Sequence, residues 1–509
     1  MALTDRPGIP AGHKFALRDI AEGENVIKYG NPIGHATRPI RKGELVDHHN
    51  LATNLSGTLD YSGITLKETD SPPALPVREG AITNDSEGIS ACQIHSAPSL
   101  TGRAGGESSF LGYPRSDGQV GIRNDIWVIP TVGCVNNICQ RIAEKAGRGT
   151  AILHFSHPYG CSQLGDDHES TRLILRDMIL HPNAGGVLVV GLGCENNQPR
   201  ELEQLLGDYD HSRIRFLVAQ EVEGDEVEVG AQIVRELYAQ AQTIQRVPVP
   251  ISSLRVGLKC GGSDGFSGLT ANPLLGAFSD WLCARGGTTI LTEVPEMFGA
   301  EHLLMQRAAS EEVLQQTIRL INDFKEYYLS HGQPVGENPS PGNKAGGIST
   351  LEEKALGCTQ KSGSSPVCGV LAYGQRLVSS NAGDAGTPLP SQEELASGLH
   401  LLCAPGNDLV ASTALAAAGC QLVLFTTGRG TPFSTFVPTL KVATNSDLFR
   451  RKPHWMDFDA GTLVSANESM DDLLERFTEL IIATANGTPT RAELAGICDI
   501  AIWKNGVTL

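Results

Sequence analysis

The sequence predicts a multidomain α/β protein with mostly parallel sheets, preceded by a small β module and a linker. From about residue 111, short apolar runs typical of buried strands alternate with helical patterns. Alternation of this kind implies parallel sheets with helices on both faces. Several of the apolar runs end in a glycine-cysteine-polar loop, at the point where parallel sheets bind their ligands. The first 110 residues lack this alternation and therefore belong to other parts of the fold.

The length of 509 residues suits about three domains, each with an ample core. We predict a division into residues 1–60, 61–110, 111–250 and 251–509. Within residues 8–60, turn residues recur at close intervals, which favours a small β module. Residues 61–110 are rich in Ser, Gly, Pro and Thr, a composition typical of linkers. The strand-like stretches of the module are Ala16–Ile20, Asn25–Gly30 and Pro32–Ala36.

The α/β region contains two long helical patterns, Asp225–Gln242 and Glu311–Tyr328. Ser310 is placed to cap the second helix, and Asn272 to cap a helix that has Pro273 at its first position. Residues 334–347 form a break rich in proline and glycine. The predicted buried strands are Ile126–Val132, Ala151–Phe155, Val187–Leu192, Leu254–Lys259, Thr288–Val294, His400–Cys403 and Gln421–Thr426.

Four of these strands lead into loops with the same pattern, which contain Cys134, Cys161, Cys194 and Cys260. Glycine allows a close approach of the backbone to a ligand, and thiolates and carboxamides suit metals or polyols. One such loop is usually a plain turn. Four with the same pattern predict a shared active site.

The richest of these loops, His157–His168, holds two histidines, a cysteine and two aspartates. This set is adequate for a divalent transition metal, with His157, Cys161 and Asp166 as ligands. The alternative is a polar loop in which Asp166 or Asp167 caps the following helix.

Further cysteines could complete the metal site, and we include Cys194 and Cys260 among the predicted ligands. Three cysteines from separate loops, Cys134 among them, could even hold an iron–sulfur cluster. The alternative for any single cysteine is that it packs as a small hydrophobic side chain.

Charged residues in four other loops are candidates for substrate binding or proton transfer. Lys344 lies among glycines and could bind a carboxylate or act as a base, although surface lysine is the default. Arg429 follows a buried strand and suits bidentate carboxylate recognition. Glu293 and Glu296 at another strand end are possible acids or bases, with helix capping as the alternative for them and for Asp408.

Several classes of protein are disfavoured by composition and by missing motifs. The formal charge of −17 argues against a nucleic-acid or anionic-membrane partner. We find neither an apolar run long enough to span a bilayer nor a signal-peptide core, so a cytoplasmic location with mostly reduced cysteines is expected. The sequence contains no CxxC pair, no GxGxxG after a strand and no GxxxxGK[ST], which disfavours zinc-ribbon, nicotinamide and nucleotide-hydrolysis sites.

At these loops the chain resembles the altronate and galactarate dehydratases. The motifs that carry the resemblance span nearly the whole chain, and the Cys161–His168 and Pro295–Glu301 stretches are similar to the altronate branch. They are Gly12–Leu17, Pro130–Asn136, Tyr159–His168, Gly191–Gln198, Cys260–Gly265, Asn338–Gly347 and Thr427–Pro432.

The resemblance implies an N-terminal β-clip (SAF) module, a middle domain used in dimerisation and a Rossmann-like C-terminal domain. It also implies a need for Fe²⁺ or Mn²⁺, and dehydration of D-altronate to 2-dehydro-3-deoxy-D-gluconate in galacturonate breakdown. The family's β-clip has a further stretch before Gly12, so we expect a trimmed module or a start that lies further upstream.

Dehydration requires removal of the proton α to a carboxylate and loss of the β-hydroxyl, for which a metal and a positioned base are suited. His168, Lys344 and Glu293 are the candidate bases. The candidate substrate-binding residues are His13, Asn196, Asp264, Asn343 and Arg429. The alternatives are a lyase for galactarate or a sulfonated hydroxy acid, an iron–sulfur redox protein, and a sugar-acid sensor, which the lack of a DNA-binding motif disfavours.

Overall fold

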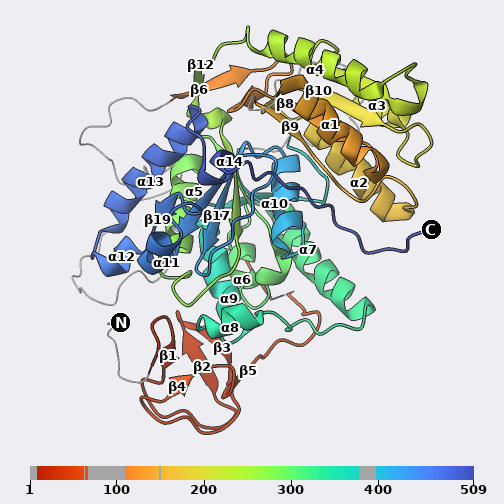
Figure 1. Cartoon of the computed structure of the whole chain (residues 1–509). Helices are drawn as coiled ribbons and strands as arrows, with labels where there is room; N and C mark the ends of the chain where they lie inside the picture. The colour runs from red at the N-terminus through yellow and green to blue at the C-terminus, as the bar shows by residue number, and fades with distance from the viewer. Residues whose placement is uncertain (1–8, 62, 67–108, 148–150, 378–396) are drawn as a thin grey trace.

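The computed structural model describes residues 9–61, 63–66, 109–147, 151–377 and 397–509. The predicted linker at 61–110 therefore falls largely outside the described residues. Figure 1 shows three parts, with the N-terminal β module at one end, the middle domain at the other, and the C-terminal domain between them. In the described part of the chain, no helix is both long and apolar enough to cross a membrane.

The N-terminal module consists of short antiparallel strands. One sheet has the order β2-β3-β5, and β1 pairs with β4. The predicted strands near Asn25 and Pro32 are confirmed, whereas Ala16–Ile20 contributes only an isolated bridge between Ile20 and Ile40. The strands are β1 (Lys14–Phe15), β2 (Asn25–Lys28), β3 (Asn31–Ala36), β4 (Leu45–Val46) and β5 (Leu51–Ala52).

The middle domain is a four-stranded parallel sheet with the order β11-β10-β8-β9. Its strands are β8 (Asp125–Pro130), β9 (Ile152–His154), β10 (Ala184–Gly191) and β11 (Ile214–Val218). Its helices are α1 (Asn136–Gly147), α2 (Gly165–Ile179), α3 (Pro199–Leu206) and α4 (Glu226–Ala241). A small antiparallel sheet joins it to the C-terminal domain through β6 (Ser109–Pro114), β7 (Val120–Gly121) and β12 (Val247–Pro250).

The C-terminal domain has a seven-stranded sheet with the order β15-β16-β14-β13-β17-β18-β19, in which all neighbours are parallel. This arrangement confirms the prediction of parallel sheets. The strands are β13 (Arg255–Cys260), β14 (Thr288–Leu291), β15 (Val367–Leu371), β16 (Gly398–Leu402), β17 (Leu422–Thr427), β18 (Thr439–Ala443) and β19 (Phe458–Asp459).

Helices of the C-terminal domain cover the sheet and extend beyond its strand ends. The longer ones are α5 (Ala271–Cys283), α7 (Glu311–Ser330), α9 (Leu351–Cys358), α10 (Asp408–Ala417) and α13 (Met470–Ala485). The shorter ones are α6 (Glu301–Met305), α8 (Pro341–Ala345), α11 (Ser446–Arg451), α12 (Thr462–Ser465) and α14 (Arg491–Leu494). Residues 334–347, predicted as a break, thus contain the one-turn helix α8.

The middle domain and the β module contact opposite ends of the C-terminal sheet (Figure 1). Gln421, at the start of β17, accepts a 2.9 Å hydrogen bond at its carbonyl from Asn183 of the middle domain. At the carboxyl ends of the strands, α9 holds the β module. Its Glu353 pairs with both Lys14 and Lys28 at 2.7 Å, and Glu352 accepts hydrogen bonds from the module as well.

The capping predictions have mixed outcomes. Ser310 does cap α7, by accepting a hydrogen bond from the Val313 N–H. Asn272 is not a cap, because α5 begins at Ala271; its side chain instead donates to the Gly357 carbonyl and accepts from Thr426. The cap of α10 is Asn407 rather than Asp408.

The aspartates at the start of α2 are likewise not its caps. Leu164 occupies the N-cap position without a side-chain hydrogen bond, and Asp166 and Asp167 lie in the first turn. There they favour the helix through its dipole. Asp167 is buried and accepts hydrogen bonds from the backbone of Asn505 and Gly506, so it anchors the C-terminal segment.

Candidate active site

A buried cluster of charged and thiol groups lies at the carboxyl ends of β13 and β14. Cys260 is the last residue of β13, and Glu296 lies in the turn after β14. Cys358 ends α9, and Lys361 lies in the next turn of chain. These side chains are at most 4% exposed, although they come from three separate stretches of sequence. We call them, with Lys259, Glu293 and Lys354, the C-terminal centre.

Ion pairs neutralise most of the charge in the C-terminal centre. Glu293 accepts hydrogen bonds from both Lys259 and Lys361, the latter at 2.6 Å, while Lys354 pairs with Glu296 at 2.7 Å. Lys259 also pairs with Asp408 at 3.0 Å. Buried charges persist only when paired and hydrogen-bonded, as these are. Glu293 adopts a left-handed backbone conformation with φ of +69°, a strained arrangement for a non-glycine residue.

Three potential metal ligands meet within the C-terminal centre. The two sulfur atoms of Cys260 and Cys358 are 3.4 Å apart, and they lie 3.3 and 3.1 Å from Oε2 of Glu296. Since a metal–sulfur bond is about 2.3 Å long, one ion can reach both thiolates at this separation. Two thiolates and a carboxylate are a suitable set for a transition metal, so these residues fit a bound ion.

The surrounding lysines adjust the acidity of this group. Burial alone would raise the pKa of Glu296, but Lys354, with Lys259 and Lys361, holds that pKa well below its usual range. The hydrogen bond shared with Cys260, together with burial, raises the pKa of Cys358 well above its ordinary value. Lys361 lies 2.8 Å from the sulfur of Cys260 and can donate to it as a thiolate. Such outer partners orient metal ligands and tune them.

Glycine-rich loops from three distant motifs meet beside this centre. A side chain at Gly265 would place its Cβ 1.9 Å from the carbonyl oxygen of Gly12, and one at Gly347 would come within 2.5 Å of the same oxygen. Only glycine permits this contact of backbone with backbone. It brings the module residue His13 to the loops that carry Asp264 and Asn343.

Two of the predicted substrate ligands in this junction have structural partners. Asp264 is buried, and its carboxylate accepts hydrogen bonds from Thr444 and Asn445 at 2.9 and 3.0 Å. Burial raises the pKa of Asp264, while these hydrogen bonds oppose the rise. Asn343 completes a capping box with Ser340. Both side chains therefore position loops, whether or not they contact a substrate.

Arg429 and Lys344 are more accessible to a substrate than Asp264 and Asn343. The Arg429 N–H donates to the Gly262 carbonyl at 2.9 Å, which places the Arg429 backbone against the loop that begins at Cys260. Its side chain is exposed and, in the parts of the chain that the structure describes, forms no ion pair. Lys344 is half-buried on α8 and close to the module: burial and His49 lower the pKa of His48, and the charge of Lys344 adds a smaller lowering.

The remaining predicted residues lie elsewhere, in the middle domain. His157 is buried, and both of its ring nitrogens contact backbone groups, at Pro130 and Tyr159. Cys161, Asp166, Cys194 and Asn196 are exposed around the ends of β9 and β10, and His168 lies on α2. The structure thus separates these residues from Cys260. The predicted ligand set is divided between two sheets, and three of the four cysteine loops share one edge.

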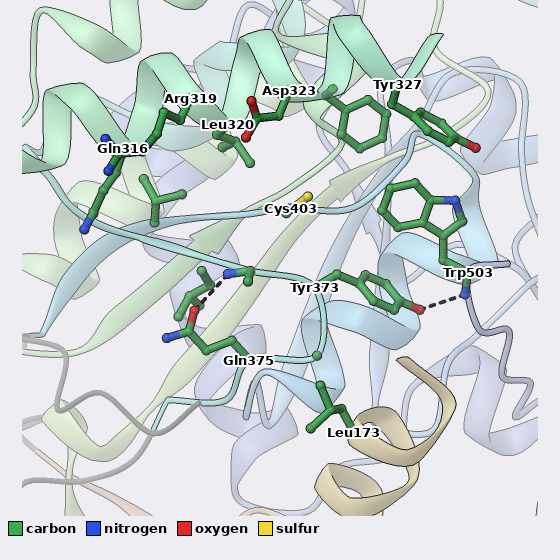
Figure 2. Close-up of a pocket in the computed structure, with 15 residues that line it drawn as sticks. Leu173, Gln316, Arg319, Leu320, Asp323, Tyr327, Tyr373, Gln375, Cys403 and Trp503 are labelled. Atoms are coloured by element: carbon green, nitrogen blue, oxygen red, sulfur yellow. Dashed lines mark hydrogen bonds between the residues drawn. The ribbon is translucent and has the colours of Figure 1, made fainter. Parts of the chain in front are cut away.

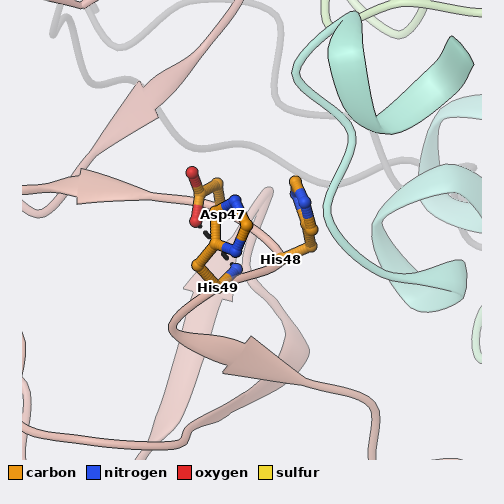
Figure 3. Close-up of side chains that lie close together, drawn as sticks. All are labelled: Asp47, His48 and His49. Atoms are coloured by element: carbon orange, nitrogen blue, oxygen red, sulfur yellow. Dashed lines mark hydrogen bonds between the residues drawn. The ribbon is translucent and has the colours of Figure 1, made fainter. Parts of the chain in front are cut away.

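Sequence reasoning missed Cys358, Lys354 and Lys361. They lie on α9 and in the turn after it, far in sequence from the four cysteine loops. Only their unusual combination of burial and charge identifies them. It also missed Asp47, His48 and His49, a second potential ligand group on the module surface (Figure 3). There the Asp47 carboxylate accepts a hydrogen bond from the His49 N–H, and nearby lysines oppose a cation.

A small and a larger cavity border the C-terminal domain within the described residues. A cavity of about 20 Å³ adjoins the C-terminal centre and is lined by Lys28, Asp264, Lys354 and Cys358, among others. It has room for about one water molecule. A larger cavity of about 570 Å³ is lined by α7, Tyr373, Trp503 and Leu173 of the middle domain (Figure 2). None of the sequence-predicted site residues lines the larger cavity.

Comparison with known proteins agrees with this three-part fold. The SAF domain of altronate/galactarate dehydratases matches residues 2–54, the second domain of D-galactarate dehydratase/altronate hydrolase matches 112–242, and the C-terminal domain of D-galactarate/altronate dehydratase matches 251–508. The chain is therefore a multidomain α/β protein with an N-terminal SAF module.

Similarity to individual proteins extends over the whole chain. An altronate dehydratase of Bacillus subtilis is 50% identical over 516 residues, covering 100% of this chain and 94% of that protein. An altronate dehydratase of Escherichia coli is 49% identical over 514 residues, with the same coverage. The galactarate dehydratase (L-threo-forming) of E. coli is 34% identical, covering 94% of this chain and 86% of that protein. The chain belongs to the altronate/galactarate dehydratase family, which confirms the resemblance seen in its motifs.

Proposed function

We propose that this protein is a hydro-lyase that removes water from D-altronate to give 2-dehydro-3-deoxy-D-gluconate. The supporting relatives are the two altronate dehydratases of about 50% identity over the full chain. The observation that carries the proposal is the C-terminal centre, with three potential metal ligands and an exposed arginine, Arg429, at the same sheet edge. Galactarate is the second candidate substrate, supported by the more distant galactarate dehydratase.

The metal that suits the centre best is ferrous iron. Mn²⁺ prefers oxygen ligands, whereas two thiolates with a carboxylate favour a softer ion. Cys260, Glu296 and Cys358 would hold it, and Lys361 would donate a hydrogen bond to the Cys260 thiolate. When bound, the ion supplies Lewis-acid stabilisation of negative charge on oxygen.

The chain's own residues would bind the substrate at the outer side of the small cavity. That cavity holds about one water molecule, so the carbon skeleton of a sugar acid has to stay outside it. We place it at Arg429 and Lys344, whose loops are hydrogen-bonded to Gly262 and Gly265. Arg429 would bind the carboxylate, since its planar guanidinium makes two parallel hydrogen bonds. Of the three predicted bases, Lys344 is the one at this junction. Glu293 already accepts from two lysines and His168 lies in the middle domain.

The test is an anaerobic assay of the purified protein with D-altronate, galactarate and sulfolactate, with added iron, manganese or chelator. We expect D-altronate to be dehydrated fastest, chelator to abolish turnover, and ferrous ion to restore it best. Full turnover by protein shown to be metal-free would contradict the metal assignment, and preference for another acid would contradict the substrate. We also propose that the protein is a cytoplasmic homodimer formed through the middle domain. Light scattering would check the dimer by its molar mass.

A further inference from the structure

The described cysteines divide sharply by exposure. Of the eleven, only Cys134, Cys161 and Cys194 are exposed; the others are buried or half-buried. Free cysteine is normally among the most buried residue types. The three exposed cysteines are also those that follow β8, β9 and β10, three neighbouring strands of the middle-domain sheet. Exposed thiols gathered from three loops at one sheet edge call for an explanation other than packing.

These three loops are fixed to one another by hydrogen bonds. The Gly133 N–H donates to the Tyr159 carbonyl at 2.9 Å, and the Asn197 N–H donates to the Gly160 carbonyl at 2.9 Å. The Ser162 N–H donates to the side chain of Asn196 at 2.7 Å. The first hydrogen bond joins the loops after β8 and β9, and the other two join the loops after β9 and β10. The three loops that carry the cysteines therefore form one connected frame. A fixed frame is what a preorganised metal site requires.

The backbones of the loops after β8 and β9 are also in close contact with each other. A Cβ at Gly160 would lie 2.1 Å from the carbonyl oxygen of Thr131, and one at Gly133 would lie 2.8 Å from that of His157. Gly160, Ser162 and Gly193, next to the cysteines, have positive φ angles of 96°, 57° and 124°. Backbone in such conformations can turn successive N–H groups toward an anion, as at many iron–sulfur sites.

The spacing of the cysteines disfavours a single ion. Two thiolates on one ion lie at most about 4.6 Å apart, because each metal–sulfur bond is about 2.3 Å. The sulfur atoms of Cys134, Cys161 and Cys194 do not form a group in which all lie within 4.8 Å of one another, in a search of the described residues. In an iron–sulfur cluster each thiolate binds a different iron, which suits a wider spacing.

We propose that Cys134, Cys161 and Cys194 bind a [4Fe–4S] cluster at the carboxyl edge of the middle-domain sheet. Three cysteine ligands leave one iron without a protein thiolate, so this iron stays open to an oxygen donor. The three thiols lose their protons on binding. This site is distinct from the C-terminal centre and is not required by the proposed function as stated.

The experiment is anaerobic reconstitution of the full-length protein with ferric iron, sulfide and dithiothreitol, which reduces part of the iron, followed by removal of unbound ions. We expect about four acid-labile sulfides and about five irons per chain, four in the cluster and one at the C-terminal centre, with a visible absorption band that dithionite bleaches. Cys134→Ser, Cys161→Ser and Cys194→Ser should each lose most of the sulfide and the band. Cys420→Ala, in the packed core, and Cys358→Ala, in the C-terminal centre, should keep both. Near-native circular dichroism of each variant excludes unfolding as the cause.

Two results would overturn the proposal. One is wild-type protein that binds iron without acid-labile sulfide, which would show that iron binds only at a mononuclear site such as the C-terminal centre. The other is equal sulfide in wild type and in the three serine variants. Because the readout is cluster content, failure here leaves D-altronate dehydration untouched. Conversely, a cluster-bearing protein that fails to dehydrate D-altronate would contradict only the proposed function.

Discussion

Two sheet edges in this protein carry cysteine loops of the same pattern but in opposite environments. At the C-terminal sheet, Cys260 is 1% exposed and joins Cys358, Glu296 and three lysines in a closed centre. At the middle-domain sheet, Cys134, Cys161 and Cys194 are exposed. The difference comes from what packs over each edge. The β module and α9 cover the first, whereas at the second the described contact is that of the C-terminal residues Thr508 and Leu509 with the loop after β9.

The comparison teaches that a loop pattern identifies an edge where ligands bind, and the cover decides which chemistry is possible there. A covered edge can keep charged groups paired out of water, which makes each of them costly to remove. At an open edge, side chains can be replaced with little change in the free energy of unfolding. Their role there is therefore to bind a ligand. The predictions below test this contrast, from the largest expected effect to the smallest.

Removal of one carboxylate should strongly destabilise the covered edge. Glu293→Gln would leave Lys259 and Lys361 with less compensation, although both remain buried. Breaking a buried ion pair typically costs about 3–5 kcal/mol. Urea unfolding should therefore show a loss of this size, while the exposed control Glu326→Gln should change stability by less than about 0.5 kcal/mol. Equal stability of the two variants would show that the buried pairs are energetically neutral.

Replacement of Arg429 should affect catalysis and not folding. Loss of one partner of a desolvated charge pair costs about 2–5 kcal/mol, and lysine cannot reproduce the bidentate geometry. Arg429→Lys should lower kcat/KM about tenfold to a thousandfold, each factor of ten being worth about 1.4 kcal/mol. Thermal stability should stay unchanged, because the side chain is exposed. The exposed Arg450→Lys is the matched control, and loss of folding in Arg429→Lys with normal turnover per folded molecule would argue against this role.

Acid should weaken the attachment of the β module to α9. Burial would raise the pKa of Glu353, but Lys28 and Lys14 lower it from 4.5 to about 2. A depressed carboxyl pKa stabilises the folded state above pH 4.5, and this contribution is lost as the pH falls from 4.5 toward 2. The midpoint temperature measured across this range should fall less steeply in Glu353→Gln than in wild type. Parallel curves would mean that these ion pairs do not hold the module.

The smallest effect is expected at the open edge. Cys161→Ser should change the free energy of unfolding by less than about 0.5 kcal/mol, as is usual for surface positions. Cys139→Ser, fully buried in the middle-domain core, should cost more because it places a hydroxyl in an apolar site. Chemical denaturation of both apoproteins makes the comparison. Greater destabilisation by Cys161→Ser would indicate that the exposed thiol has a structural role.

The sequence was sufficient for the fold class because the period and length of its apolar runs are local properties. Val187–Leu192 and Gln421–Thr426 were predicted close to their observed bounds for this reason. Cap positions were harder to predict. The N-cap of α5 is Thr270, because the side chain of Asn272 instead forms hydrogen bonds with Gly357 and Thr426, which are distant in sequence. Nothing local could have shown that four similar loops belong to two sheets, because strand order is decided by packing.

For the candidate site, motifs pointed to Cys260, Glu293, Glu296 and Arg429 since they follow strands. Cys358 and Lys361 follow no strand, and their partners are about a hundred residues away in sequence. Their role depends on burial, which a single sequence does not reveal for a lysine or a cysteine. His157 shows the reverse case, a residue of promising chemistry whose ring nitrogens are already occupied by backbone groups.

The contact of Gly12 with Gly265 and Gly347 adds a backbone-to-backbone contact to the ion pairs by which Glu353 of α9 holds the β module. A single methyl group at Gly265 would push the module away without altering the interior of either part. The contacts with Glu352 and Glu353 would then have to hold the module alone, and whenever they open, its return is set by the effective concentration that the connecting chain provides. Such a defect would leave the secondary-structure content almost unchanged. Limited proteolysis would reveal it, because the short strands of an undocked module become accessible to cleavage.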